Sequence, residues 1–282
     1  MLARTFVAGV DTANIRNDLS AYLKAANAVK LEEELGDGES GTTITKPNGT
    51  HVITVNTREP EVRKRYTLCH EIAHIILKLP SSHAAVPAWA FAKRDLNEIH
   101  CDTFAAELLM PYKQWREKLP KEEPSAAVID YMAGEFNCSF PAAASRYATL
   151  ADMPCAYVTM EHGAIKYAAR SRALRDLKAW IPPRSTIPDG SVASRIRADG
   201  NSQIATGSVD QDIWFQDWDK GMDMMELARH YHSSDTTLSL LWFDADDGPI
   251  VEVDRFGVKL IDEGGLKELT GELPWPGRSK RR

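Results

Sequence analysis

The sequence lacks a long hydrophobic run, and its apolar stretches, such as Leu238 to Phe243, are the size of a strand. A membrane-spanning helix needs about 18 to 20 apolar residues, so we expect no membrane segment. Charged and amide residues interrupt the first stretch, MLARTFVAGVDTANIRNDL, before a secretory signal could form. These absences predict a cytoplasmic protein.

Cysteine and positive charge are also scarce. The 282 residues include four cysteines, Cys69, Cys101, Cys138 and Cys155, and no C-x-x-C pair. In a cytosolic protein this predicts small, reduced, buried residues rather than a disulfide framework. Lys and Arg number 34 against 40 Asp and Glu, which gives a formal net charge of −6. This balance argues against a protein that wraps nucleic acid over its whole surface.

The spacing of apolar residues predicts helices and a small sheet in the first half of the chain. Apolar residues at helical spacing predict a helix over residues 11–28. Short runs rich in Thr and Val between residues 29 and 57 predict a small antiparallel sheet. Two longer helices are expected at residues 61–79 and 95–110, each ended by a proline.

After residue 150 the pattern changes to short strands separated by glycine-containing turns. The strands are expected at residues 155–160, 164–169, 236–243, 250–253 and 258–261. We therefore predict an α+β fold in three parts. These are a domain at residues 1–120, a helical segment at 121–150 and a mixed α+β domain at 151–282.

The segment RYTLCHEIAHIIL, at residues 65–77, has a spacing that suits metal binding. His70 and His74 are four residues apart, so on a helix they lie about 6 Å apart along one face and can share one metal ion. Glu71 follows the first histidine, where a helix places its carboxylate beside the same ion, ready to take a proton from water. Imidazole favours Zn²⁺, and a catalytic zinc site needs three protein ligands and one open position. The alternative is a helix with two histidines on a solvated or core face.

The third ligand is expected from the next helix. Glu98 and Asp102 are four residues apart and share one helical face. With Glu98 as ligand and Asp102 as the partner of a ligating imidazole, the metal site would be complete. His100 lies about 160° from this face on a helical wheel, so it is the weaker choice of ligand.

The two motifs, RYTLCHEIAHIIL and then EIHCDTFAAELLMP from residue 98, resemble those of the ImmA/IrrE family of metallopeptidases. The resemblance covers about residues 50–150 and implies a zincin-like metallopeptidase domain. Carried over position by position, it implies that His70, His74 and Glu98 bind Zn²⁺ and that Glu71 is the general base. Mn²⁺ is the alternative operating metal.

Three positions depart from the family pattern. Cys69 replaces a small apolar residue, and Cys101 with Asp102 replaces an Ala-Asn pair. A thiol near zinc could form a redox switch, but helical geometry turns Cys69 about 100° from His70, so we expect it to pack in the core. The oxyanion-stabilising residue stays open among three candidates, Tyr66, Tyr112 and His83.

Residues 125–150 have the rhythm of a helix-turn-helix, a segment that members of the resembled family often carry. Between Lys121 and Leu150 there are two basic residues against four acidic ones. A DNA-reading helix needs several cations to contact phosphates. We therefore expect this segment to pack on the peptidase domain rather than to bind DNA.

Residues 151–282 resemble the GAF-like region of some family members, which implies a regulatory domain that receives an unidentified small-molecule or protein signal. Trp214, Phe215 and Trp218 there suit a recognition surface or the packing of a helix on a sheet, with packing favoured.

By resemblance, the protein would be a zinc endopeptidase that cuts an XRE-type helix-turn-helix repressor and so relieves repression under stress. The alternative is a non-catalytic regulator of transcription, stapled by zinc, that acts through the sensor domain. Glu71 separates the two, because a structural zinc site needs no general base and usually closes with a fourth protein ligand.

Overall fold

The computed structural model describes residues 2–36, 38–80, 96–200, 203–215, 218 and 222–249. Up to residue 150 the elements are α1 (Leu2–Ala8), α2 (Ser20–Ala25), β1 (Ala28–Glu33), β2 (Gly41–Thr45), β3 (His51–Asn56), α3 (Glu61–Leu77), α4 (Leu96–Leu109), α5 (Tyr112–Lys118), α6 (Ala126–Phe136) and α7 (Phe140–Leu150). After it they are β4 (Cys155–Glu161), β5 (Ala164–Arg170), α8 (Arg172–Asp176), α9 (Val192–Asp199), β6 (Ile204–Asp210), α10 (Gln211–Trp214), β7 (Asp223–Tyr231), η1 (His232–Ser234), β8 (Thr236–Trp242) and η2 (Ala245–Asp247). Within the described ranges, no helix is both long and apolar enough to cross a membrane.

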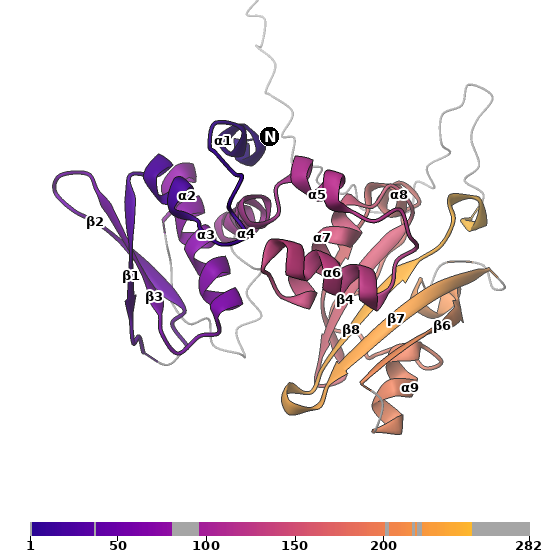
Figure 1. Cartoon of the computed structure of the whole chain (residues 1–282). Helices are drawn as coiled ribbons and strands as arrows, with labels where there is room; N and C mark the ends of the chain where they lie inside the picture. Colours follow the sequence, from indigo (N-terminus) through magenta and orange to yellow (C-terminus); the bar gives the residue numbers. More distant parts are fainter. Residues whose placement is uncertain are drawn as a thin grey trace, which may run out of the picture. The chain divides into compact units, whose positions relative to one another are not determined.

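The N-terminal sheet has three strands in the order β1-β3-β2 (Figure 1). β2 and β3 are antiparallel because a tight turn joins them, closed by the Lys46 N–H donating to the Thr50 carbonyl. β1 runs parallel to β3, with Ala28 opposite His51. The prediction of a purely antiparallel sheet is therefore wrong for β1. The chain crosses from one edge strand to the other and only then returns along the centre of the sheet.

α3 covers one face of this sheet. Ile53 and Val55 on the central strand have no exposed surface and share one apolar core with Leu68 and Ile72 of α3. Their alternation along β3 follows from the period of two in a strand. The buried face of the sheet thus sets the position of the helix that carries both histidines.

α3 and α4 confirm the helices predicted at residues 61–79 and 95–110, with α4 described from its first residue at position 96. α3 ends where Lys78 takes the left-handed conformation, which satisfies carbonyls of the last turn. α4 packs along α3 through buried Cys101 and Phe104. The metal ligands expected on the two helices are therefore brought to one seam.

The helix predicted at residues 11–28 is wrong over its first half, because only α2 is helical there. The side chains of Asp11 and Asp18 accept the N–H groups of Ala13 and Ser20, and such local bonds favour turns over helix. Five apolar residues made this pattern. Ile15, Leu19, Tyr22 and Ala26 are nevertheless buried, and Leu23 is half-buried.

Two short helices joined by a tight turn follow α5, as predicted for residues 125–150. Ser125 caps α6 and Ser139 caps α7, since each hydroxyl accepts an N–H from the first turn of its helix. Between them Asn137 has a φ of 47°, a left-handed conformation that asparagine tolerates.

The C-terminal sheet has five antiparallel strands in the order β5-β4-β8-β7-β6 (Figure 1). β4, β5 and β8 confirm the strands predicted at residues 155–160, 164–169 and 236–243. The strands predicted at 250–253 and 258–261 lie outside the described residues. Helices with a small sheet, followed by an antiparallel sheet domain, confirm the α+β fold class.

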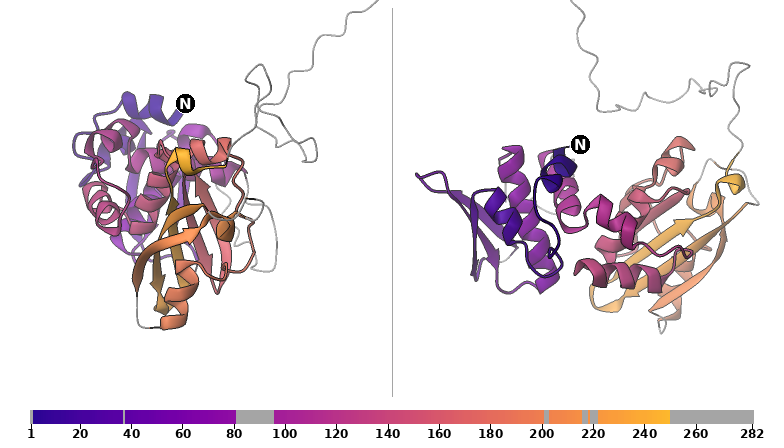
Figure 2. Two further views of the ribbon diagram at one scale, coloured as in Figure 1. Left: turned by 90° about the vertical axis from the view of Figure 1, so that its right-hand side faces the viewer. Right: turned by 45° about the horizontal axis from the view of Figure 1, so that its top comes forward.

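Helices cover both faces of the C-terminal sheet (Figure 2). Tyr157 of β4 belongs to the core that contains residues of α7, whereas the adjacent Val158 belongs to a second core with α9. Trp214 and Phe215 are buried in this second core, 2% and 1% exposed. These aromatic residues therefore pack on the sheet, which confirms the interpretation favoured from the sequence.

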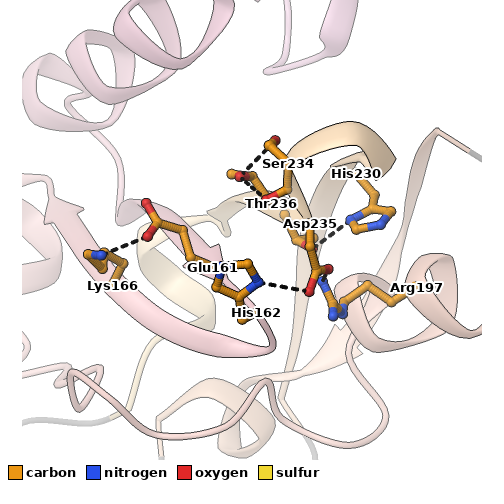
Figure 3. A network of polar contacts seen from close by, with 9 residues as sticks. Glu161, His162, Lys166, Arg197, His230, Ser234, Asp235 and Thr236 are labelled. Carbon is orange, nitrogen blue, oxygen red and sulfur yellow. Dashed lines mark hydrogen bonds and ion pairs between the residues drawn. The ribbon is translucent and has the colours of Figure 1, made fainter. Parts of the chain in front are cut away.

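A network of polar side chains joins the turns at one end of the C-terminal sheet (Figure 3). Asp235, between β7 and β8, accepts a hydrogen bond of 2.5 Å from Arg197 of α9 and lies 3.3 Å from Nδ1 of His162. Arg197 also donates to Thr237, whose hydroxyl contacts Nδ1 of His230. The hydrogen bond from Arg197, with help from His162, holds the pKa of Asp235 below its usual value.

Candidate metal centre

α3 carries both histidines of the predicted site on one side of the helix. The Nε2 atoms of His70 and His74 lie 3.1 Å apart, and the rings meet edge to face with centroids 4.8 Å apart. The side chain of His74 is 2% exposed and that of His70 14%. The spacing of four residues accounts for this proximity, because it returns to the same helical face.

α4 brings the carboxylate of Glu98 to the pair. Its Oε2 lies 3.0 Å from Nε2 of His70, and its Oε1 lies 3.6 Å from Nε2 of His74. Atoms bound to one tetrahedral zinc ion at about 2.0–2.1 Å stand roughly 3.3 Å from one another, so the three side chains fit such an ion. In the part of the chain that the structure describes, this is the one group of three or more metal-ligating side chains close enough to share an ion.

Asp102, one turn after Glu98 on α4, faces the other ring nitrogen of His70. Its Oδ1 lies 3.1 Å from Nδ1 of His70 and accepts a hydrogen bond from the Tyr66 hydroxyl. Burial alone would lower the pKa of His70. The contact with Asp102, supported by Glu71 and Glu98, outweighs burial and raises that pKa above its usual value.

Glu71 lies on α3 beside the histidines and is 1% exposed. Its Oε2 accepts a hydrogen bond of 2.6 Å from the Thr43 hydroxyl on β2. β2 can approach α3 this closely because residue 41 is glycine: a Cβ on Gly41 would lie 2.4 Å from Cγ2 of Thr67 and 3.0 Å from the Thr54 carbonyl oxygen. The packing of β2 on α3 thus holds a buried carboxylate in a fixed orientation.

The remaining candidates from the sequence lie apart from the ligand group or are engaged elsewhere. His100 is exposed on α4 and is not one of the three grouped ligands. The Tyr66 hydroxyl donates a hydrogen bond to the carboxylate of Asp102 on α4. The Arg4 guanidinium lies over the Tyr112 ring, 3.9 Å from its centroid. His83 lies outside the described residues.

Both cysteines near the site are buried. Cys69 and Cys101 have no exposed surface. Burial raises the pKa of the Cys69 thiol to about 12, so almost no thiolate exists at neutral pH to bind metal or react with an oxidant. The prediction that Cys69 packs in the core is confirmed.

Two contacts of the site have no signal in the sequence. Thr43 reaches Glu71 from a strand 28 residues earlier in the chain, and only the pairing of β2 with β3 brings it there. Helical spacing places Tyr66 on the same side of α3 as His70. Its bond to Asp102 depends on how α4 is aligned along α3, which the spacing does not determine.

Two imidazoles and a carboxylate on paired helices, with a buried glutamate beside them, form the type of site that zinc peptidases use. Residues 27–147 match the family model Peptidase_M78, the IrrE N-terminal-like domain, so this part of the chain is similar to that family. The match confirms the resemblance drawn from the two motifs. The matched range includes α3, α4 and all three grouped ligands.

One solved structure with a similar fold is a Mycobacterium tuberculosis transcriptional regulator, with a TM-score of 0.57 and 14% sequence identity. The alignment covers 85% of this chain and 74% of that chain. At this identity the similarity concerns the fold alone. No curated protein matches the sequence.

Proposed function

We propose that the protein is a zinc-dependent endopeptidase in which His70, His74 and Glu98 hold the metal and Glu71 is the general base. The convergence of three ligand atoms within 4.8 Å of one another supports this function. A catalytic zinc needs three protein ligands, whereas a structural zinc usually has four. In the described structure Asp102 contacts Nδ1 of His70 rather than joining the ligand group.

The residues around the ligands have distinct tasks in this proposal. A bound zinc ion would polarise water and the substrate carbonyl. Glu71 takes a proton from the attacking water and delivers it to the leaving amine, as a general base and then a general acid. Thr43 holds the Glu71 carboxylate, while Asp102 and Tyr66 hold the His70 ring.

β2 is the strand on which we propose the substrate binds. It is an edge strand of the N-terminal sheet, and Thr43 on it touches Glu71. An edge strand presents backbone N–H and C=O groups to which an extended peptide can pair. A peptide added to this edge would run past Glu71.

The substrate we propose, from the family resemblance, is an XRE-type repressor whose cleavage relieves repression under stress in the cytoplasm. The C-terminal sheet region would respond to a small-molecule or protein signal. We propose the division at residues 1–120, 121–150 and 151–282, with Zn²⁺, or alternatively Mn²⁺, as operating metal.

The burial and hydrogen bonds of Arg146, a basic residue of α7, argue against direct DNA binding through α6 and α7. Arg146 is 8% exposed and its guanidinium donates to Glu107 of α4 at 2.5 Å and to the Met110 carbonyl at 2.7 Å. A side chain committed in this way is not available to phosphates. The helix pair instead packs on the peptidase domain.

The alternative is a regulator of transcription in which zinc only stabilises the fold. The fold shared with a mycobacterial transcriptional regulator favours keeping it as second candidate. A purely structural site gives Glu71 no chemical task, so a Glu71→Gln protein would then behave as the wild type.

Mass spectrometry of new peptide termini tests the proposal. A lysate of the host is incubated with zinc-loaded wild-type protein or with Glu71→Gln, and His100→Ala serves as control for a substitution on an exposed histidine. We expect new termini in one or a few proteins with the wild type and with His100→Ala, and none with Glu71→Gln. Termini that appear equally with Glu71→Gln would contradict the proposed mechanism.

A further inference from the structure

A hollow of about 240 Å³ lies between α3, the end of α4 and the turn from α6 to α7. Its walls come from three parts of the chain: Val62, Arg63 and Tyr66 of α3, Leu109 of α4, and Cys138, Ser139 and Ala142 in the α6–α7 turn and the start of α7. The predicted helix-turn-helix segment therefore supplies one side of this hollow.

The hollow continues the seam that holds the metal ligands. Val62, Tyr66 and His70 follow one another at intervals of four residues, so they form one stripe along α3. Tyr66 belongs to both sites. Its ring lines the hollow and lies 6.1 Å, centroid to centroid, from the ring of His70, while its hydroxyl donates to Asp102. A group bound in the hollow would thus lie next to the metal centre.

The lining predicts what the hollow would accept. Val62, Leu109 and Ala142 make its surface apolar, and the space suffices for an aromatic ring, since an engineered cavity of about 150 Å³ binds benzene. The Ser139 hydroxyl already caps α7. Arg63 is exposed beside the hollow, and no described carboxylate forms an ion pair with it. Its guanidinium is suited to a carboxylate from outside the chain.

We propose that this hollow is a specificity pocket that takes a large apolar side chain of the substrate, followed or preceded by an acidic residue that pairs with Arg63. The inference rests on the proposed peptidase function, because it names the peptide sequence that the metal centre would receive. It also gives the α6–α7 turn a task in substrate binding.

Fluorescence anisotropy with labelled peptides tests the pocket without requiring cleavage. Short Gly-Ser peptides carry Phe-Glu, Ala-Glu or Phe-Lys at the centre and are titrated with zinc-loaded wild-type protein. The Phe-Glu peptide should bind roughly tenfold more tightly than Ala-Glu, because an aromatic side chain leaves water. It should bind about threefold more tightly than Phe-Lys, the size expected of an exposed ion pair.

Matched variants test whether the hollow and Arg63 cause these differences in peptide affinity. Ala142→Phe fills the hollow and should remove the preference for Phe over Ala, whereas Ala142→Ser should keep it. Arg63→Glu, an exposed change that spares the core, should reverse the preference between Glu and Lys. Lys24→Glu makes the same charge change on the exposed side of α2 and should leave that preference unaltered. Zinc content and circular dichroism verify that each variant is folded.

The outcomes separate the pocket from the peptidase function. Equal affinity of the three peptides for the wild type, or a Phe preference that persists in Ala142→Phe, would overturn the pocket even if peptides are cut. The same peptides are followed by mass spectrometry for cleavage with wild type and Glu71→Gln. Selective binding without any cleavage would support the hollow as a peptide-binding site and contradict the proposed peptidase function.

Discussion

At the scale of single residues, Asp102 contacts His70, one of the proposed metal ligands, without belonging to the ligand group. It contacts Nδ1 of His70 at 3.1 Å and receives a hydrogen bond from Tyr66. Because Nδ1 then faces a carboxylate, Nε2 of His70 is the nitrogen left to point at Glu98 and the metal. Asp102 and Glu71 therefore have different tasks, and their variants should fail in different ways.

Asp102→Asn should lower zinc affinity by about 10- to 100-fold, because the partner that orients His70 is weakened. Added zinc should partly restore its cleavage rate. Glu71→Gln should keep its zinc and its fold but lose about 10² to 10⁴ in rate, with no rescue by zinc. Chelator competition and cleavage rates over a series of zinc concentrations measure both effects. If zinc rescues the two variants alike, Glu71 supports the site rather than acting as base.

The raised pKa of His70 predicts a pH dependence of the metal-free protein. Its pKa in the fold lies above the ordinary value of 6.5, chiefly because Asp102 outweighs burial. Protonated His70 thus stabilises the metal-free fold below pH 6.5, and this contribution is lost as pH rises through the raised pKa. Zinc affinity should rise as the pH rises through the same pKa, because metal and proton compete for the imidazole.

Urea unfolding of the metal-free protein at a series of pH values, with a parallel series of zinc titrations, measures both trends. Asp102→Asn should shift both to lower pH, since it removes the largest cause of the raised pKa. Curves that are identical in wild type and Asp102→Asn would show that Asp102 does not set the protonation of His70.

At the scale of elements, a buried ion pair joins α4 to α7. Arg146 and Glu107 lie 2.5 Å apart, with side chains 8% and 7% exposed. Glu107 also accepts the Tyr112 N–H at the start of α5. Burial lowers the pKa of Arg146, although the adjacent carboxylate opposes this shift. One carboxylate therefore connects three helices next to the candidate metal centre.

Glu107→Leu should destabilise the protein by about 3–5 kcal/mol, because it leaves a buried guanidinium without its partner. The double variant Glu107→Leu with Arg146→Met should cost much less, since it buries no unpaired charge. Urea denaturation of wild type, single and double variants measures the difference. A double variant as unstable as the single one would mean that packing, and not the unpaired charge, causes the loss.

The sequence predicts elements well where the signal is local and poorly where it depends on distant pairing. α3 and α4 follow from helical spacing, so the candidate ligands on them could be proposed from the sequence. The parallel pairing of β1 with β3 could not, because the order of strands depends on the chain's path between them. β7 was missed because Glu226 and His230 lie on its buried face, so the buried positions of this strand do not form an apolar pattern in the sequence.

At the scale of the whole described chain, the apolar core continues past residue 150. Tyr147 and Ala148 of α7 share a core with Tyr157 of β4 and Leu240 of β8. α7 thus precedes the predicted boundary in the sequence, yet it covers the C-terminal sheet in the structure. The boundary at residue 151 stays a prediction, and the shared core predicts that the two sides depend on each other.

A protein that ends at residue 150 should therefore be less stable than the full chain and should expose apolar surface on α7. A lower midpoint of thermal unfolding and increased binding of a hydrophobic dye are the expected results. A truncated protein with the same unfolding midpoint and no dye binding would show that the core beyond residue 150 adds nothing to stability.

The central claim is that α3 and α4 hold one zinc ion through three ligands and leave a fourth position open. Anomalous diffraction at the zinc edge, from crystals of zinc-loaded protein, tests it most directly. We predict a single peak at about 2.0–2.2 Å from Nε2 of His70, Nε2 of His74 and the Glu98 carboxylate, with no protein atom in the fourth position. A fourth protein ligand, or a peak away from these three side chains, would contradict the claim.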